Sequence, residues 1–178
     1  FRYSLRMDEP LAPISEELKH LKNYMFVINV RMNDSIHMTI DIPADMLKTS
    51  VPRLSLQPLV ENAISHGLRN KRGEKQIHIS ARRTQTEILL SIADNGVGMS
   101  EEMLEKVRTM NPEKALSAGT SIGLLNIAAR LKLLFGREYG LEVESGEQEG
   151  TKVILHIPLI LLAGRRVWKD LSLLQEVM

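Results

Sequence analysis

Asp94-Asn95-Gly96-Val97-Gly98-Met99 is the stretch that decides how the rest of this sequence is interpreted. It follows an alternating apolar run from Ile88 to Ile92, which predicts a strand that ends just before it. A carboxylate at a strand end is held rigidly, and two nearby glycines let the backbone turn sharply and approach a ligand closely. An acceptor beside such a bend suits an exocyclic amine, such as N6 of adenine. Asp-Asn-Gly is also an ordinary turn sequence, so this stretch alone leaves both interpretations open.

Composition restricts the classes of protein that this chain can represent. Its 178 residues are enough for one domain with an appended element, and 43% of them are hydrophobic, which supports a sizeable core. The net charge of +1 argues against a protein that binds nucleic acid through a large excess of cations. The absence of cysteine excludes disulfides and thiolate zinc sites. No apolar run approaches the roughly 20 residues of a membrane-spanning helix, and because the sequence begins at Phe1 we expect a fragment of a longer protein.

The first third of the chain predicts a lead-in and a long helix. Residues 1–14 show no clear period and are expected to be irregular. A helix is expected over 15–33, because apolar residues recur there at spacings of three and four: Leu18, Leu21, Met25, Ile28 and Met32. This seam predicts either a helix that faces the core or a helix that packs against a partner helix.

Farther along, apolar periods of two and of about 3.6 residues alternate and predict the remaining elements. The expected elements are strand 36–42, helix 56–67, a hairpin of strands 77–81 and 88–92, helix 100–110, helix 119–136, and closing strands 141–143 and 153–157. Residues 159–178 have helical spacing but show no link to anything before them.

Three of these elements carry residues whose chemistry suits a nucleotide. The first is the strand that ends at Asp94, with Gly96 and Gly98 after it. The helix of residues 56–67 bears Asn62, whose amide oxygen is a hard ligand of the kind that Mg²⁺ accepts. A glycine-rich helix start at Gly119 to Gly123 would offer free backbone N–H groups to phosphate. The sequence has no Walker A motif, and the hairpins around the glycine motifs argue against the βαβ units of a Rossmann fold.

Four ordered motifs then resemble those of the bacterial sensor histidine kinases, in the subfamily typified by LytS and YesM. The run Leu56-Gln57-Pro58-Leu59-Val60-Glu61-Asn62-Ala63-Ile64-Ser65-His66-Gly67 resembles the N box of that family. Asp94 to Gly98 resembles its G1 box, Gly119 to Leu124 its G2 box, and Gly150-Thr151 its closing glycine-threonine pair. Order and spacing agree, and the resemblance covers roughly residues 4–158.

The resemblance implies an α+β fold of the Bergerat type, a two-layer sandwich with a mixed, mostly antiparallel sheet and helices on one face. It implies ATP and Mg²⁺ as cofactors, with Asn62 on the metal and Asp94, flanked by Gly96 and Gly98, on the adenine amine. His66 would lie against the nucleotide and Thr151 near the adenine. The phosphates would be enclosed, under a lid of about residues 99–118, by Gly119, Thr120, Ser121, Ile122, Gly123 and Leu124.

The resemblance also implies a domain arrangement and partners. Residues 1–34 would be the end of a dimerisation region, 35–158 the ATP-binding catalytic domain, and 159–178 a tail. The γ-phosphate of ATP would pass to a histidine on a phosphoacceptor helix upstream of this fragment, and then to a response regulator. The full protein would be a homodimer anchored in the cell membrane, with this domain in the cytoplasm and no nucleic-acid partner.

The chain departs from the family pattern at several positions. Ser65 stands where the family often has Lys, so a phosphate-contacting cation is missing or is supplied by Arg69 or Lys71. Ser121 stands where a third glycine is usual, and both changes bear on nucleotide affinity. The Asn-Pro-His-Phe segment that would carry the phosphoacceptor histidine is absent. The flanks of His20 do not match that segment, so His20 is read as solvated in preference to a phosphoacceptor.

Two other functions stay open from the sequence. ATPases of the gyrase, chaperone and mismatch-repair type use a general-base Glu four residues before the motif's Asn, a position that holds Pro58 here. Glu61 is the remaining candidate base, although its position also suits a helix surface. A nucleotide-binding regulatory module without chemistry is the third interpretation, and Ser65 and Ser121 are its best support.

Overall fold

A five-stranded sheet with helices on one face forms the body of the protein. The computed structural model describes residues 10–31, 36–109 and 122–159. The strands lie in the order β2 (Ile36–Asp41), β4 (Lys75–Arg83), β5 (Glu87–Asp94), β7 (Gly150–Pro158) and β6 (Leu141–Gly146). β2 and β4 are parallel, whereas the other neighbouring pairs are antiparallel. The predicted α+β class and mixed, mostly antiparallel sheet are therefore confirmed.

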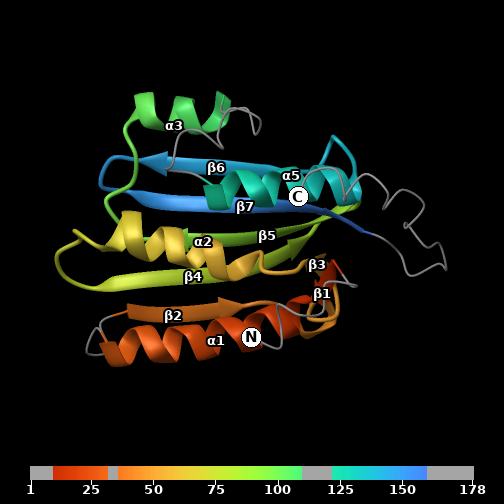
Figure 1. The fold of residues 1–178 in the computed structure, drawn as a ribbon, viewed down its shortest axis with the longest axis horizontal. Helices are drawn as coiled ribbons and strands as arrows, with labels where there is room; N and C mark the ends of the chain where they lie inside the picture. The colour runs from red at the N-terminus through yellow and green to blue at the C-terminus, as the bar shows by residue number, and fades with distance from the viewer. Residues whose placement is uncertain (1–9, 32–35, 110–121, 160–178) are drawn as a thin grey trace.

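The helices lie along one face of this sheet (Figure 1). They are α1 (Ile14–Arg31), α2 (Leu56–Asn62), a π-helix (Ala63–Leu68) that directly continues α2, and α5 (Ile122–Phe135). The shorter α3 (Glu101–Thr109) lies beside the edge strand β6. None of the helices in the described ranges has the length and apolar character needed to cross a membrane.

The alternation that predicted the strands also determines the core. On β4, β5 and β7 every second side chain is apolar and buried: Ile77, Ile79, Ala81, Ile88, Leu90, Ile92, Val153, Leu155 and Ile157. These side chains form one cluster with the inner faces of the helices, including Leu18, Leu21 and Met25 of α1. The first part of the α1 seam is thus core-facing, as one of the two sequence interpretations predicted. The final seam residue, Met32, lies outside the described residues.

The beginning of the chain differs from the prediction. Residues 11–13 are not irregular but form β1 (Leu11–Pro13), which pairs antiparallel with β3 (Ser50–Pro52). Three residues are too few to show a period, and the partner strand lies far along the sequence. α1 begins at Ile14, so Ser15 lies within the helix and donates its backbone N–H to the Leu47 carbonyl at 3.0 Å.

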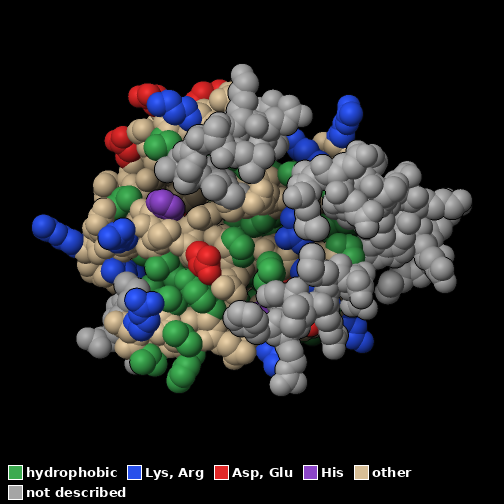
Figure 2. All heavy atoms as spheres, in the orientation of Figure 1, with side chains coloured by type: hydrophobic (Ala, Val, Ile, Leu, Met, Phe, Trp, Pro, Cys, Tyr) green, Lys and Arg blue, Asp and Glu red, His purple; other side chains and the backbone are tan. Residues whose placement is uncertain are grey.

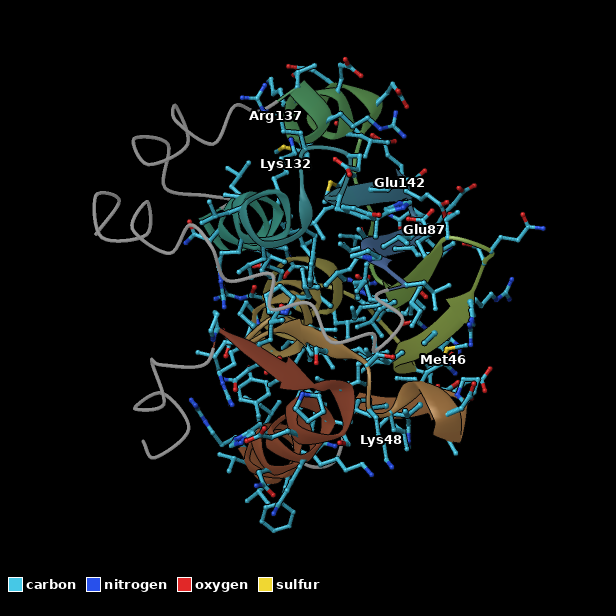
Figure 3. All side chains as sticks on the ribbon, turned by 90° about the vertical axis from the view of Figure 1, so that its right-hand side faces the viewer. Met46, Lys48, Glu87, Lys132, Arg137 and Glu142 are labelled. Carbon is cyan, nitrogen blue, oxygen red and sulfur yellow. The ribbon has the colours of Figure 1, made fainter. Side chains whose placement is uncertain are left out.

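Charged side chains are distributed differently over the two faces of the sheet. On the helical face, Lys and Arg side chains are spread over several elements, while acidic side chains gather over α3 (Figure 2). On the opposite face, Glu87 and Glu142 point away from α5 (Figure 3), and His156 lies 2.9 Å and 3.3 Å from their respective carboxylates. That face is polar, and none of the α-helices in the described ranges lies on it.

Candidate functional site

The end of the N-box helix meets the end of β5 in direct contact. A Cβ added at Gly67 would lie 2.5 Å from Asp94 Oδ1, and a Cβ added at Gly96 would overlap the Gly67 carbonyl group. The Val97 N–H also donates to the Gly67 carbonyl at 3.0 Å. Only residues without side chains allow this approach. The end of the N-box helix and the Asp94–Gly98 segment, which lie apart in the sequence, therefore form one surface around the Asp94 carboxylate.

Asp94 is a largely enclosed hydrogen-bond acceptor. Its Oδ1 accepts the Gly96 N–H at 2.8 Å. Burial raises the pKa of Asp94, while the backbone N–H groups of Gly96 and Thr151 and the charge of Lys71 act to lower it. Thr151 stands opposite Asp94 in the β5–β7 register, so the strand predicted to reach the adenine does lie beside this carboxylate. Lys71, proposed as a substitute phosphate cation, exerts its charge on Asp94.

Asn62 lies beside the beginning of α5. A Cβ added at Gly123 would be 3.4 Å from Asn62 Nδ2 and 3.7 Å from the Cβ of Pro58. The half-buried Asn62 amide therefore lies beside the first described turn of α5. An amide oxygen beside a helix start fits an ion held between a side chain and phosphate oxygens.

The two halves of the site are linked by one continuous helical segment. Gly67 follows Asn62 by five residues on this segment. The segment changes from α to π geometry at Ala63, and such changes are frequent at functional sites. His66 is exposed on this π-helix, about one turn from Asn62.

Two other N-box side chains make local contacts. Glu61 accepts a hydrogen bond from Gln57 Nε2 at 2.8 Å, one turn earlier on the same helix. The Ser65 hydroxyl donates to the Glu61 carbonyl at 2.7 Å. The carboxylate of Glu61 thus makes the helix-surface contact that one sequence interpretation predicted.

Ser145 holds the loop after Asp94 in place, a role that no local sequence pattern indicates. Its Oγ accepts the Met99 N–H at 3.0 Å, donates to the Gly150 carbonyl at 2.8 Å and lies 3.0 Å from Thr151 Oγ1. Gly98 adopts a positive φ of 66° and lies against the Gly146 carbonyl, where a side chain would overlap. The β6–β7 turn therefore holds the end of the Asp94–Met99 segment, whereas Gly67 of the π-helix contacts its beginning.

Asn95 has a structural role within the same motif. Its Oδ1 accepts the Gln76 N–H at 2.9 Å, and its Nδ2 donates to the Glu74 carbonyl at 3.1 Å. These bonds join the end of β5 to the start of β4. The turn interpretation of Asp-Asn-Gly thus describes Asn95, whereas the role of Asp94 as a site residue stays a prediction.

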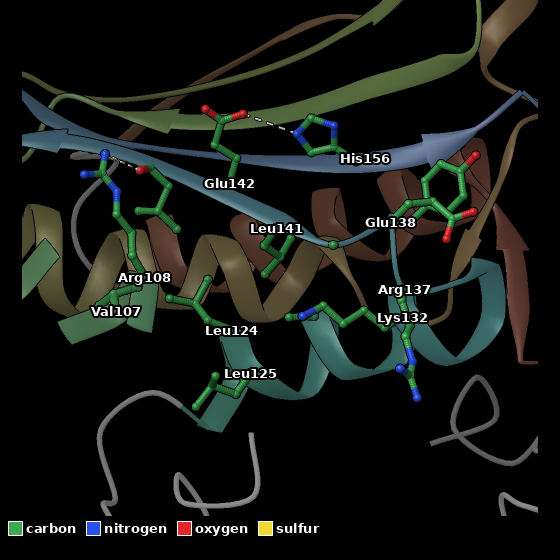
Figure 4. Close-up of a pocket in the computed structure, with 14 residues that line it drawn as sticks. Val107, Arg108, Leu124, Leu125, Lys132, Arg137, Glu138, Leu141, Glu142 and His156 are labelled. Atoms are coloured by element: carbon green, nitrogen blue, oxygen red, sulfur yellow. Dashed lines mark hydrogen bonds and ion pairs between the residues drawn. The ribbon is translucent and has the colours of Figure 1, made fainter. Parts of the chain in front are cut away.

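The glycine-rich segment lies only partly within the described residues. Gly119, Thr120 and Ser121 lie outside them, and Ile122 is the first residue of α5. Leu124 lines a cavity of about 470 Å³ on the α3 side of α5, together with Leu125, Leu141 and Val143 (Figure 4). Arg108 of α3 donates to the Val143 carbonyl at 3.4 Å across this cavity. Gly123 therefore lies against Asn62, whereas Leu124 lines this cavity.

Comparison with known proteins agrees with this geometry. Residues 52–161 match the family described as histidine kinase-, DNA gyrase B-, and HSP90-like ATPase. Sensor histidine kinase YesM of Bacillus subtilis is 32% identical over 88% of this chain and 26% of its own length. Sensor histidine kinase YpdA of Escherichia coli is also 32% identical, over 88% of this chain and 26% of its own length. The chain thus spans about a quarter of the length of these relatives.

Solved structures show the same fold. The catalytic domain of histidine kinase ThkA superposes with a TM-score of 0.59 over 83% of this chain and 93% of that chain, at 17% identity. The histidine kinase domain of the blue-light activated kinase EL346 of Erythrobacter litoralis superposes with a TM-score of 0.53, over 83% of this chain and 61% of that chain, at 19% identity. The chain therefore belongs to the histidine kinase-, DNA gyrase B- and HSP90-like ATPase family, as an ATP-binding catalytic domain of the sensor histidine kinase type.

Proposed function

We propose that this domain binds Mg-ATP between Asp94 and Asn62 and transfers the γ-phosphate to a histidine upstream of the fragment. The observation that carries the proposal is the single helical segment on which Gly67 contacts Asp94 while Asn62 lies against Gly123. This segment sets the distance between an acceptor suited to adenine and a helix start suited to phosphate. Both ends of one nucleotide would then be held by a rigid element.

At the adenine end, the ionised Asp94 would accept hydrogen from the N6 amine. Guanine carries an acceptor oxygen at the equivalent position, so the carboxylate would discriminate against it. Thr151 lies beside Asp94, and its hydroxyl is held by Ser145. His66 would cover the nucleotide from the exposed side of the π-helix.

At the phosphate end, Asn62 would be the protein ligand of Mg²⁺, and the start of α5 would bind phosphate oxygens through its N–H groups. Bound there, Mg²⁺ would supply charge neutralisation on the phosphate oxygens. Gly119, Thr120, Ser121, Ile122, Gly123 and Leu124 would enclose the phosphates as the resemblance implies. Gly96 and Gly98 would let the backbone approach the adenine.

Transfer to a protein acceptor is favoured over hydrolysis by the residues of α2. The position of the water-activating Glu in the related ATPases holds Pro58, which has no proton acceptor in its side chain. Glu61, the other candidate base, is hydrogen-bonded to Gln57. We therefore expect slow hydrolysis in the absence of an acceptor.

The proposed partners follow from the relatives, which are sensor kinases. They are a phosphoacceptor helix of the same protein, a response regulator, and a second copy of the full-length protein. We further propose that the longer protein is anchored in the cell membrane, with this domain on the cytoplasmic side. Nucleic acid is not among the proposed partners, because the net charge is only +1 and the Lys and Arg side chains of the described residues are spread out on the face in Figure 2.

Incubation with γ-labelled ATP and Mg²⁺ tests the proposal. A fragment carrying the upstream helix, added in trans, should acquire an acid-labile label on histidine, whereas the domain alone should not label itself. Asn62→Ala should abolish the labelling, and Gln85→Ala, an exposed amide in the β4–β5 turn, should leave it unchanged. Asp94→Ala should weaken ATP binding by about tenfold or more, since a lost buried polar partner costs about 1–3 kcal/mol.

Each contrary result has a defined meaning. Rapid phosphate release without the partner would favour the ATPase function, and nucleotide binding without any transfer would favour a regulatory module. Labelling of His20 in the domain alone would place the acceptor within this fragment. Equal affinity for GTP and ATP would show that Asp94 does not select adenine.

A further inference from the structure

Glu17 is a buried acid whose contacts lie far along the chain. Glu17 lies in the first turn of α1 and is only 3% exposed. Oε1 accepts the Leu54 N–H at 2.8 Å, while Oε2 accepts the N–H groups of Ser55 at 2.8 Å and Leu56 at 3.2 Å. One carboxylate therefore binds three successive backbone N–H groups at the start of α2.

These N–H groups need an acceptor from outside α2. The first N–H groups of a helix have no partner within it, and the residue before the helix usually supplies one through its side chain. Here Ser55 makes no such bond, because its hydroxyl donates to the Pro52 carbonyl at 2.5 Å. Leu54, with a φ of 56°, turns the chain so that all three N–H groups face Glu17. α1 thus provides the cap of the helix that carries Asn62.

Tyr24 of α1 also packs against the core that α1 shares with α2. Tyr24 of α1 is half-buried, and its pKa is raised by burial and further by the negative charge of Glu61. Glu61 directly precedes Asn62. α1 and α2 run side by side in Figure 1 and share the hydrophobic core. Glu17 therefore holds the start of α2 on α1, and the shared core packs the two helices together.

We propose that Glu17 is a positioning residue for the nucleotide site, through which α1 holds Asn62 beside the start of α5. The inference rests on the proposed function, because it assigns Asn62 to the metal. Leu56, which Glu17 caps, lies six residues before Asn62 on one helix, so loss of the cap lets α2 shift relative to the start of α5. The far end of the segment keeps its own anchors, because the Val97 N–H donates to the Gly67 carbonyl at 3.0 Å and Asp94 is held by Gly96 and the β-sheet. The contact of Asp94 with adenine therefore does not depend on Glu17.

The test separates these two ends of the nucleotide. Binding of ATP is measured with Mg²⁺ and with a chelator, and binding of adenosine is measured alongside. Glu17→Gln should reduce the gain in affinity that Mg²⁺ provides by about tenfold, the scale of one lost charged hydrogen-bond partner. The adenosine dissociation constant should stay within about twofold of the parent value. Amide exchange at Ser55 and Leu56 should become faster.

Glu16→Gln is the matched control, since it makes the same chemical change one residue earlier, where the carboxylate lies 3.5 Å from Arg53. It should leave the Mg²⁺-dependent gain unchanged. Glu17→Asp keeps the charge on a shorter side chain and should cause a smaller loss; it decides the matter if Glu17→Gln does not fold.

The outcomes distinguish this inference from the proposed function. If the parent protein binds ATP with a Mg²⁺-dependent gain and folded Glu17 variants keep this gain, only the proposed role of Glu17 is overturned. An equal loss in Glu16→Gln overturns it as well, because a general charge effect would then explain both. A parent protein that shows no Mg²⁺-dependent binding overturns the proposed function, and the inference with it.

Discussion

Gly67 lies so close to the carboxylate of Asp94 that a Cβ on Gly67 would be 2.5 Å from Asp94 Oδ1. The position of the Asp94 carboxylate, the proposed acceptor for adenine, thus depends on the absence of a side chain at Gly67. Gly96 contacts Gly67 from the other side, so the strand end and the helix end meet backbone to backbone. Neither motif could form this surface without the other.

Gly67→Ala should therefore displace the Asp94 carboxylate and weaken adenosine and ATP binding by about tenfold or more. Forcing a methyl group into a packed site typically costs about 1–3 kcal/mol, so the midpoint of thermal unfolding should also fall. Isothermal titration and thermal unfolding measure the two effects. Gly73→Ala is the control, because Gly73 has no atom within 4 Å of an added Cβ. Its φ of 81° strains any substitution, so it should lower stability without changing nucleotide affinity.

The pH dependence of adenosine binding should report the ionisation of Asp94. Burial raises its pKa, so the folded chain keeps this proton to a higher pH than the unfolded chain does. The stabilising contribution of this proton is fully present below the ordinary pKa of an aspartic acid, about 3.9. It is lost as the pH rises through the raised value, so the ligand-free fold loses stability across that window. Adenosine affinity should rise across the same window, because the ionised carboxylate is the acceptor for N6.

Asp94→Asn removes this titration and is the comparison for both measurements. Thermal unfolding and adenosine titrations of parent and variant should be compared from about pH 4 to 8. The unfolding midpoint of the variant should gain on that of the parent as the pH rises. Parallel profiles for the two proteins would show that Asp94 does not titrate in this range and would contradict the expected rise in its pKa.

The parts of the fold that could be predicted from the sequence are those with a local period. The strands β4, β5 and β7 each contain a run of five residues with an apolar side chain at every second position, and the structure forms strands of eight or nine residues around these runs. Asp94 could be identified because a strand period ends directly before a pair of glycines. The short β1 could not, since its three residues acquire meaning only from pairing with β3.

The site residues that the sequence did not reveal all act over long separations. Glu17 binds N–H groups 37 to 39 residues away, and Ser145 binds Met99 46 residues away. A glutamate in the first turn of a helix is ordinary on helix-dipole grounds, so nothing local marks Glu17 as a cap for another helix. Ser145 lies in a strand with no distinguishing neighbour. Such roles appear only when the chain is folded.

Ser145→Ala should loosen the loop that follows Asp94. It leaves the Met99 N–H without its acceptor and removes the hydroxyl contact with Thr151. An unsatisfied buried donor costs about 1–3 kcal/mol, and we expect a stability loss of that order with weaker ATP binding. Chemical denaturation and nucleotide titration measure both quantities.

Ser80→Ala is the matched control for that variant. Ser80 is also a half-buried strand serine with a hydroxyl partner, Ser91 at 2.8 Å, but it lies on the face of the sheet away from the helices. It should leave nucleotide affinity unchanged. Equal effects of the two substitutions on ATP affinity would argue that Ser145 acts through general stability and not through the loop.

The tail should be dispensable for nucleotide binding, with the cut placed after Leu159. The predicted boundary at residue 158 falls one residue earlier, but the Leu159 N–H donates to the Thr86 carbonyl at 3.0 Å and its side chain packs against the core. Residues 160–178 lie outside the described residues, and all four motifs precede them.

A chain ending at Leu159 should keep its unfolding midpoint and bind ATP within about twofold of the parent affinity. A chain ending at Leu155 should lose stability, because it removes the buried Ile157 and the end of β7. Lost nucleotide binding in the first chain would show that the tail contributes to the site itself.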